Sequence, residues 1–296
     1  LLASAGWDGN IRLWDARHFK DVGSLSSHAD SNFITSVCFT SDSQRLISAS
    51  WDRSLKVWDV NKGNLITTMR GHLMPVSSVA VWPGGDKLIS GGQDKTVKIW
   101  NLANLDARLD FAGHTNHVLT AAFVADGRRV ASSGLDNHLK VWDAGTGETY
   151  MDITSAAIAD GATSVPAEQK ACVLALAAMP DGRHFATARS DGLVEIKDAV
   201  DNNAPPQKLG KQAAAAMSIA VSPDGSHIAS GSVGGIIEVW DNHGRAVQTI
   251  NVIHGRITSL AFSRDGKHLA AGSDDGPVRI FDLATGKKIQ ELTGHA

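Results

Sequence analysis

A short stretch near the beginning of the chain decides the fold. Residues 46–59 read LISASWDRSLKVWD. Two apolar bursts of strand length lie at 46–50 and 55–58, on either side of a turn that contains Asp52. Bursts this short, separated by turn residues, indicate β-strands rather than helices. The stretch therefore predicts a β-hairpin whose second strand ends at Trp58-Asp59.

The same signature recurs along the whole chain, about every 42 residues. In each copy a turn residue stands six positions before the aromatic position. A small residue stands four positions earlier still, and it is a Ser or Thr in every copy except one, where it is Ala271. The aromatic positions, with the residues that follow them, are Trp14-Asp15, Trp58-Asp59, Trp100-Asn101, Trp142-Asp143, Lys197-Asp198, Trp240-Asp241 and Phe281-Asp282. Copies with such constant internal spacing predict an all-β protein built from seven repeats.

The repeat resembles the WD40 family over essentially all 296 residues. The likeness is carried by a Gly-His pair such as Gly71-His72, by the turn Asp and by the strand that ends in Trp-Asp. The resemblance implies one domain, residues 1–296, folded as a seven-bladed β-propeller of four-stranded antiparallel blades around a central channel. The strands of each blade are called a to d from the inside outward. The interval between the fourth and fifth copies is longer than the others, and we expect an insertion loop at about 154–170 between strands d and a.

The resemblance also implies a buried hydrogen-bonded set in each blade: a His before strand a, a hydroxyl on strand b, the turn Asp and the Trp of strand c. A carboxylate that orients an imidazole, which in turn reaches a hydroxyl and an indole, satisfies several buried polar groups together. The sets are His28, Ser48, Asp52 and Trp58 in blade two, His72, Ser90, Asp94 and Trp100 in blade three, and His114, Ser132, Asp136 and Trp142 in blade four. Blades five to seven depart from the pattern at Lys197, Gly234 and Phe281. We expect these three blades to be locally less stable, because polar partners are missing.

The two ends of the chain belong to the same blade in this interpretation. The first six residues align with a strand b, so blade one begins without its inner strand, and Gly294-His295 is a Gly-His pair with no strand after it. We therefore expect the set of blade one to be His295, Ser4, Asp8 and Trp14, with the two ends as neighbours in space. Because the chain opens inside a strand pattern without Met, we also expect it to be a piece of a longer polypeptide. An inner strand of about ten residues would then lie beyond one end.

No catalytic site is predicted. Ser, His and Asp in one neighbourhood resemble a nucleophilic triad, but here the same trio repeats from blade to blade, whereas a catalytic site occurs once. The sequence contains no phosphate-binding glycine loop, no dinucleotide-binding glycine motif and no clustered Cys and His spacing of a zinc site. We therefore expect neither a metal nor any other cofactor.

Composition narrows the range of partners. The net charge is −3, and Lys and Arg are scattered along the chain, so nucleic acid is not expected as a partner. No apolar run approaches the roughly 18 residues of a membrane span, so direct membrane insertion is not expected either. The compartment stays open, with the cytoplasm as the default for a soluble chain.

For function, the sequence favours an interaction scaffold. We predict a non-catalytic protein that binds a protein or peptide partner, within a multi-subunit complex, on the face formed by the b–c turns and d–a loops. The candidate contact residues are Trp7, Trp51, Phe33, Leu73, Met74 and Gln93. Large aromatic side chains exposed together are favoured anchors at interfaces. The simpler interpretation is that each indole packs only over its neighbouring blade. The alternative function is a propeller domain attached to an enzyme or electron-carrier domain outside this chain.

Overall fold

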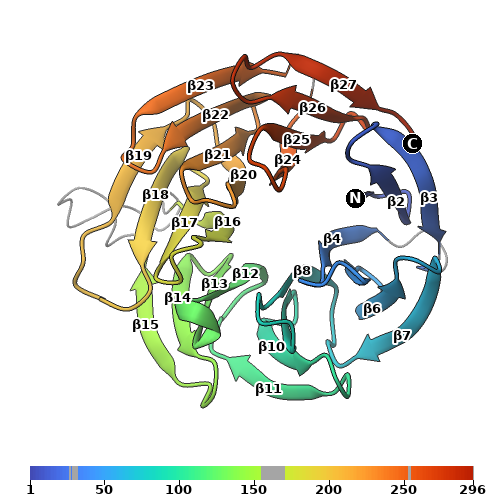
Figure 1. Cartoon of the computed structure of the whole chain (residues 1–296). Coiled ribbons are helices and arrows are strands. Elements are labelled where there is room, and N and C mark those ends of the chain that lie inside the picture. The colour runs from blue at the N-terminus through green and yellow to red at the C-terminus, as the bar shows by residue number, and fades with distance from the viewer. Residues whose placement is uncertain (27, 29–32, 155–170, 253–254, 296) are drawn as a thin grey trace.

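The computed structural model is a ring of seven antiparallel β-sheets around a central opening (Figure 1). It describes residues 1–26, 28, 33–154, 171–252 and 255–295. The strands of each sheet follow one another in sequence order, so each sheet is one consecutive segment of the chain. The predicted all-β class and the seven blades are therefore confirmed. Within the described ranges the helical structure is a single 3₁₀ turn, η1 (Ala125–Gly127).

Each blade runs from the central opening outward in the order of its strands. Blade one consists of β1 (Leu2–Ala5), β2 (Asn10–Asp15) and β3 (Lys20–Ser26). Blades two to four consist of β4 (Ile34–Phe39), β5 (Arg45–Ser50), β6 (Ser54–Asp59) and β7 (Asn64–Arg70); β8 (Val76–Val81), β9 (Lys87–Gly92), β10 (Thr96–Asn101) and β11 (Ala107–Ala112); and β12 (Val118–Val124), β13 (Arg129–Gly134), β14 (His138–Asp143) and β15 (Thr149–Thr154). Blades five to seven consist of β16 (Val173–Ala178), β17 (His184–Arg189), β18 (Leu193–Asp198) and β19 (Gln207–Lys211); β20 (Ala216–Val221), β21 (His227–Ser232), β22 (Ile236–Asp241) and β23 (Ala246–Asn251); and β24 (Ile257–Phe262), β25 (His268–Ser273), β26 (Val278–Asp282) and β27 (Lys288–Leu292).

The hydrophobic core is divided among the interfaces between neighbouring blades. At six interfaces the aromatic residue near the end of strand c lies in the same buried cluster as an apolar residue from strand d of the preceding blade. These pairs are Trp14 with Leu292, Trp58 with Leu25, Trp100 with Met69, Trp142 with Phe111, Trp240 with Leu209 and Phe281 with Ile250. Burial of one large apolar side chain contributes about 1.5–3 kcal/mol, so these pairs hold each blade to the next.

The interface between blades four and five lacks such an aromatic residue. Met151 of β15 is buried there, but the aromatic position of blade five is Lys197. A cavity of about 330 Å³ opens at this interface, and Met151, Ile153, Lys197 and Pro206 are among the residues that line it. The register shift between strands c and d, which elsewhere falls directly before the aromatic position, falls between Val194 and Glu195 in blade five. The change from an aromatic residue to a cation therefore alters both the packing and the register of this blade.

The ring closes through contacts between blades one and seven. Trp14 packs in a buried cluster with Val278, Ile280 and Leu292. The two ends of the chain lie on the same side of the ring (Figure 1), and His295 is hydrogen-bonded to Ser4. The prediction that the ends are neighbours is therefore confirmed, and blade one has three strands. Of the insertion loop predicted at about 154–170, only the first residue, the last of β15, lies within the described residues.

Candidate functional site

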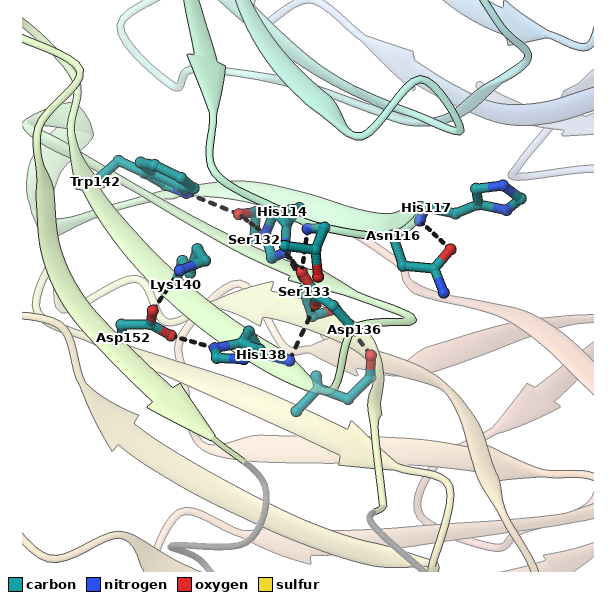
Figure 2. Close-up of polar contacts among 12 residues, drawn as sticks. His114, Asn116, His117, Ser132, Ser133, Asp136, His138, Lys140, Trp142 and Asp152 are labelled. Carbon is teal, nitrogen blue, oxygen red and sulfur yellow. Dashed lines mark hydrogen bonds and ion pairs between the residues drawn. The ribbon is translucent and has the colours of Figure 1, made fainter. Parts of the chain in front are cut away.

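The hydrogen-bonded set of blade four shows how the turn between strands b and c is held (Figure 2). His114 Nδ1 lies 2.9 Å from Asp136 Oδ2, and His114 Nε2 lies 2.8 Å from Ser132 Oγ. The indole Nε1 of Trp142 donates to Ser132 Oγ at 2.8 Å. A neutral imidazole satisfies every partner: Nδ1–H donates to the carboxylate, Nε2 accepts the Ser132 hydroxyl, and that oxygen accepts the indole N–H. Burial lowers the pKa of His114 despite the nearby Asp136 carboxylate, which favours this neutral form.

Three further sets have the same geometry. In each, a His lies between the turn Asp and a Ser that accepts the indole N–H. The His Nδ1–Asp Oδ2, His Nε2–Ser Oγ and Trp Nε1–Ser Oγ distances are 3.0, 2.8 and 2.8 Å in the set of His295, Asp8, Ser4 and Trp14. They are 2.9, 2.8 and 3.0 Å in the set of His28, Asp52, Ser48 and Trp58. In the set of His72, Asp94, Ser90 and Trp100 they are 2.9, 2.7 and 2.9 Å. The structure thus brings together the residues that the repeat pattern grouped, including the set drawn from both ends of the chain.

The trios of blades two to four do not offer a nucleophile to a substrate. The Ser48, Ser90 and Ser132 side chains are 0% exposed. Each hydroxyl also already accepts from an indole and contacts an imidazole, so both its hydrogen-bonding roles are taken. A triad serine needs access to the substrate carbonyl. The contacts instead tie the b–c turn to strands b and c of its blade.

The turn aspartates are ionised in this arrangement. Burial opposes ionisation of Asp52, but hydrogen bonds from His28 and Ser54 outweigh it and hold the pKa of Asp52 below its ordinary range. Burial of Asp94 is likewise outweighed by His72, and its pKa is lowered. An anionic carboxylate accepts several hydrogen bonds at once, which stabilises the tight turn between strands b and c.

Blades five to seven contain substitutes that sequence reasoning missed. In blade five the Arg189 guanidinium donates to both carboxylate oxygens of Asp191, at 3.2 and 2.9 Å. In blade six Gln212 Nε2 donates to Ser230 Oγ at 2.6 Å, and in blade seven Arg279 donates to Asp275 Oδ1 at 2.9 Å. Arg189 and Gln212 thus supply polar contacts in blades five and six that the repeat pattern did not predict, while the lower local stability of blades five to seven stays a prediction. His254, the His that precedes the inner strand of blade seven in the sequence, lies outside the described residues.

The sequence did carry a signal for Arg189. It stands two residues after the strand b hydroxyl, where blades three and four have Gly92 and Gly134. A Cβ at Gly92 would lie 2.5 Å from His72 Nδ1, and blade two, which also keeps its His, has only the small Ser50 at this position. Arg189, by contrast, has no imidazole of this kind from a described residue beside it. A large residue at this position therefore indicates a blade whose polar set is built differently.

Blade five also buries the carboxylate of Glu195 beside two cations. Glu195 is 0% exposed, and its Oε2 lies 3.2 Å from Lys197 Nζ and 3.8 Å from an Arg189 guanidinium nitrogen. Neither carboxylate oxygen of Glu195 makes a hydrogen bond within the described structure. Burial lowers the pKa of Lys197, opposed by the attraction of Glu195. The negative charge of Glu195 is thus compensated by ion pairs alone. The stability of this blade is therefore sensitive to the loss of either partner.

The aromatic candidates form one continuous cluster on the face of the b–c turns. The Phe33 ring lies between the two indoles, with centroid distances of 5.0 Å to Trp7 and 5.1 Å to Trp51. Both indoles remain accessible, at 73% and 47% exposure. Each indole therefore packs against a residue of its neighbourhood, Phe33, as the simpler interpretation held. This packing nevertheless leaves most of the Trp7 ring open to solvent. We call Trp7, Phe33 and Trp51 the aromatic cluster.

The other candidates lie in the next blades along the ring. Leu73 and Met74, in the loop before β8, are 79% and 46% exposed. The Leu73 N–H donates to Asp94 Oδ2 at 2.9 Å, which ties this loop to the b–c turn of blade three. Gln93 is half-buried, and its backbone N–H donates to the Pro75 carbonyl at 2.8 Å. Gln93 thus holds the loop before β8 in place through its backbone, whereas the side chains of Leu73 and Met74 extend the apolar surface.

In the part of the chain that the structure describes, no group of three or more His, Cys, Asp or Glu side chains has the geometry to hold a metal ion. Across the same residues, no helix is long and apolar enough to cross a membrane.

Comparison with protein families agrees with the geometry. The WD40 model, described as WD domain, G-beta repeat, matches residues 1–15, 19–59, 63–101, 107–143, 206–241 and 245–282. Every match ends at the last residue of a strand c, so each match after the first joins the outer strand of one blade to the three inner strands of the next. The first three strands of blade five, with Arg189 and Lys197, lie between two matches. A search of curated proteins finds no match. Because the six matches cover more than half of the chain and coincide with the blades, the chain belongs to the WD40 family.

Proposed function

We propose that this propeller is a non-catalytic scaffold that binds a protein or peptide partner on the face formed by the b–c turns and d–a loops. WD40 propellers commonly serve as protein-interaction scaffolds. The observation that carries the proposal here is the aromatic cluster, in which Trp7 and Trp51 remain 73% and 47% exposed on either side of Phe33. The proposed setting is a multi-subunit complex, with protein rather than nucleic acid as the partner.

The exposure of several adjacent large apolar side chains to water is energetically unfavourable. Single exposed apolar residues are ordinary on protein surfaces, but adjacent large ones mark interaction sites. Leu73 and Met74 extend the apolar area toward blade three. Trp is the residue most enriched among those that dominate binding energy, since it buries a large area and loses little rotamer freedom.

The cluster is also held rigidly. Trp7 and Trp51 each stand directly before a turn Asp that is hydrogen-bonded to a His of its blade. The backbone N–H of Trp51 donates to the Phe33 carbonyl at 3.0 Å, which joins the turn of blade two to the loop before β4. Binding groups that are already ordered lose less conformational entropy when a partner docks.

The test compares two pairs of substitutions in the purified protein. Trp7→Ala with Trp51→Ala removes the cluster, while Val247→Ala with Ile289→Ala removes exposed apolar side chains from the outer strands β23 and β27. We expect a protein from the source cell to be retained by the wild type and by the outer-strand variant. Its affinity, measured by calorimetry with the purified partner, should fall at least about 30-fold in the Trp7/Trp51 variant, which corresponds to about 2 kcal/mol. Equal affinity for all three proteins would contradict the proposal.

A further inference from the structure

The b–c turns of all seven blades contain one residue in the left-handed backbone region. The residue after the turn position has φ of 73° at Gly9, 69° at Arg53, 70° at Lys95, 64° at Asn137, 86° at Gly192, 73° at Gly235 and 103° at Gly276. Glycine adopts this conformation freely, whereas a residue with a Cβ is disfavoured there. Four blades use glycine, but blades two and three hold basic side chains at a cost to stability. Strained residues that a surface turn retains point to a function.

The basic side chains are free to meet a partner. Arg53 and Lys95 are exposed, and neither forms an ion pair with any residue that the structure describes. Arg70, which is also exposed, pairs with Ser54 across the β6–β7 register and adds a third cation beside Arg53.

The carboxylates of the same turns are already engaged. The side chains of Asp52 and Asp94 are 20% and 5% exposed, and each is hydrogen-bonded to a His. A protein with net charge −3 thus presents its cations, and not its carboxylates, on the b–c turns of blades two and three.

Each of these cations belongs to the same turn as an apolar candidate or to a turn that is hydrogen-bonded to one. Arg53 follows Trp51 by two residues, in the same turn. Lys95 directly follows Asp94, whose carboxylate accepts the N–H of the exposed Leu73. A partner that contacts the aromatic cluster and continues toward blade three therefore meets both apolar side chains and cations.

We propose that the partner contributes an acidic peptide segment that carries a large apolar side chain, with carboxylates on Arg53 and Lys95 and the apolar side chain on the aromatic cluster. This inference rests on the proposed function and specifies its partner. Carboxylates form charge-assisted hydrogen bonds with guanidinium and ammonium groups, and complementary charge selects the partner and its register. The apolar contact supplies most of the affinity.

The test selects peptides from a random 12-residue library displayed on phage, with the purified protein as the target. We expect the enriched peptides to contain at least two Asp or Glu residues near a Trp, Phe or Leu. A fluorescein-labelled copy of the leading peptide should bind the Arg53→Gly/Lys95→Gly variant about tenfold more weakly than the wild type, and the difference should shrink at 0.5 M salt. Because glycine suits this backbone, the variant should melt at the wild-type temperature or about 1–3 °C above it.

Asn137→Gly is the matched control, since it makes the same backbone change in blade four without removing a charge. It should leave the affinity for the peptide unchanged. Enrichment of neutral or basic peptides that need Trp7 and Trp51 would overturn the inference about charge and leave the proposed function standing. A library that yields no peptide bound more tightly by the wild type than by the Trp7→Ala/Trp51→Ala variant would contradict both.

Discussion

His295 and Ser4 are hydrogen-bonded at 2.8 Å although 291 positions separate them in the chain. The Ser4 oxygen accepts the indole N–H of Trp14, and the other ring nitrogen of His295 lies 3.0 Å from Asp8. Elsewhere a complete set is made within one short segment, but in blade one it joins the last residues of the chain to the first. The polar set that ties a turn to its blade therefore also ties the two ends of the ring together.

Removing this link should loosen blade one first. His295→Ala leaves Asp8 and Ser4 without their partner, so we expect the free energy of unfolding to fall by about 1–3 kcal/mol. Amide hydrogen exchange in β1 and β2 should accelerate more than in blades three and four, because local opening becomes easier. His18→Ala is the control, since the His18 side chain is 69% exposed, and it should change stability by less than about 0.5 kcal/mol. Equal exchange in β2 for the two variants would show that His295 does not support closure.

The protein should lose stability on acidification in two stages. The pKa of His114 is lowered below its ordinary 6.5, mainly by burial, so the unfolded chain takes up this proton more readily than the folded one. Stability therefore declines as the pH falls below about 6.5. The pKa of Asp52 and Asp94 is lowered below 3.8, so their contribution, present above that pH, is lost as the pH falls further.

Melting temperatures measured from pH 3 to pH 8 test this order. We expect a plateau above about pH 7, a shallow decline toward pH 5 and a steep decline below pH 4. His114→Gln should remove part of the shallow decline, because Gln does not titrate and Gln212 already takes the place of the imidazole at Ser230 in blade six. A melting temperature that rises between pH 7 and pH 5 would contradict the assignment of a neutral His114.

The buried charges of blade five should behave as a coupled unit. Glu195→Gln leaves Lys197 buried without its carboxylate, and we expect a loss of about 3 kcal/mol. Lys197→Met alone should also destabilise the protein, since Glu195 would keep only the 3.8 Å contact with Arg189. The double variant should cost less than the sum of the two single changes by at least about 1 kcal/mol in urea unfolding. Strictly additive losses would mean that the ion pair contributes nothing.

Tryptophan fluorescence should report the aromatic cluster directly. Trp7 and Trp51 are 73% and 47% exposed, whereas the strand c tryptophans are 2–3% exposed. Iodide should therefore quench only part of the tryptophan emission. The double variant Trp7→Phe with Trp51→Phe should lose most of the quenchable emission while its new rings still pack against Phe33. If the double variant is quenched as strongly as the wild type, the indoles are covered in solution.

The sequence by itself determined the repeat, the number of blades and the four hydrogen-bonded sets. The repeat and the blade number follow from groups that recur at constant spacing, and the resemblance to the WD40 family implied which of these groups form a hydrogen-bonded set. His295 could be assigned to Ser4, Asp8 and Trp14 for the same reason, since a ring of repeats places the last Gly-His pair next to the first strand. The aromatic candidates could be named, although their arrangement around Phe33 could not.

Tertiary structure decided the contacts that have no constant spacing. Arg189 reaches the turn Asp of its blade from within strand b, and Arg279 does so from strand c. No single sequence offset identifies these two contacts, whereas Gln212 stands 18 residues before Ser230, the same offset as His72 before Ser90. The Phe33 ring lies between Trp7 and Trp51 because two blades bring separate turns and a loop together on one face. Such contacts follow from the packing of neighbouring blades, which only the assembled ring specifies.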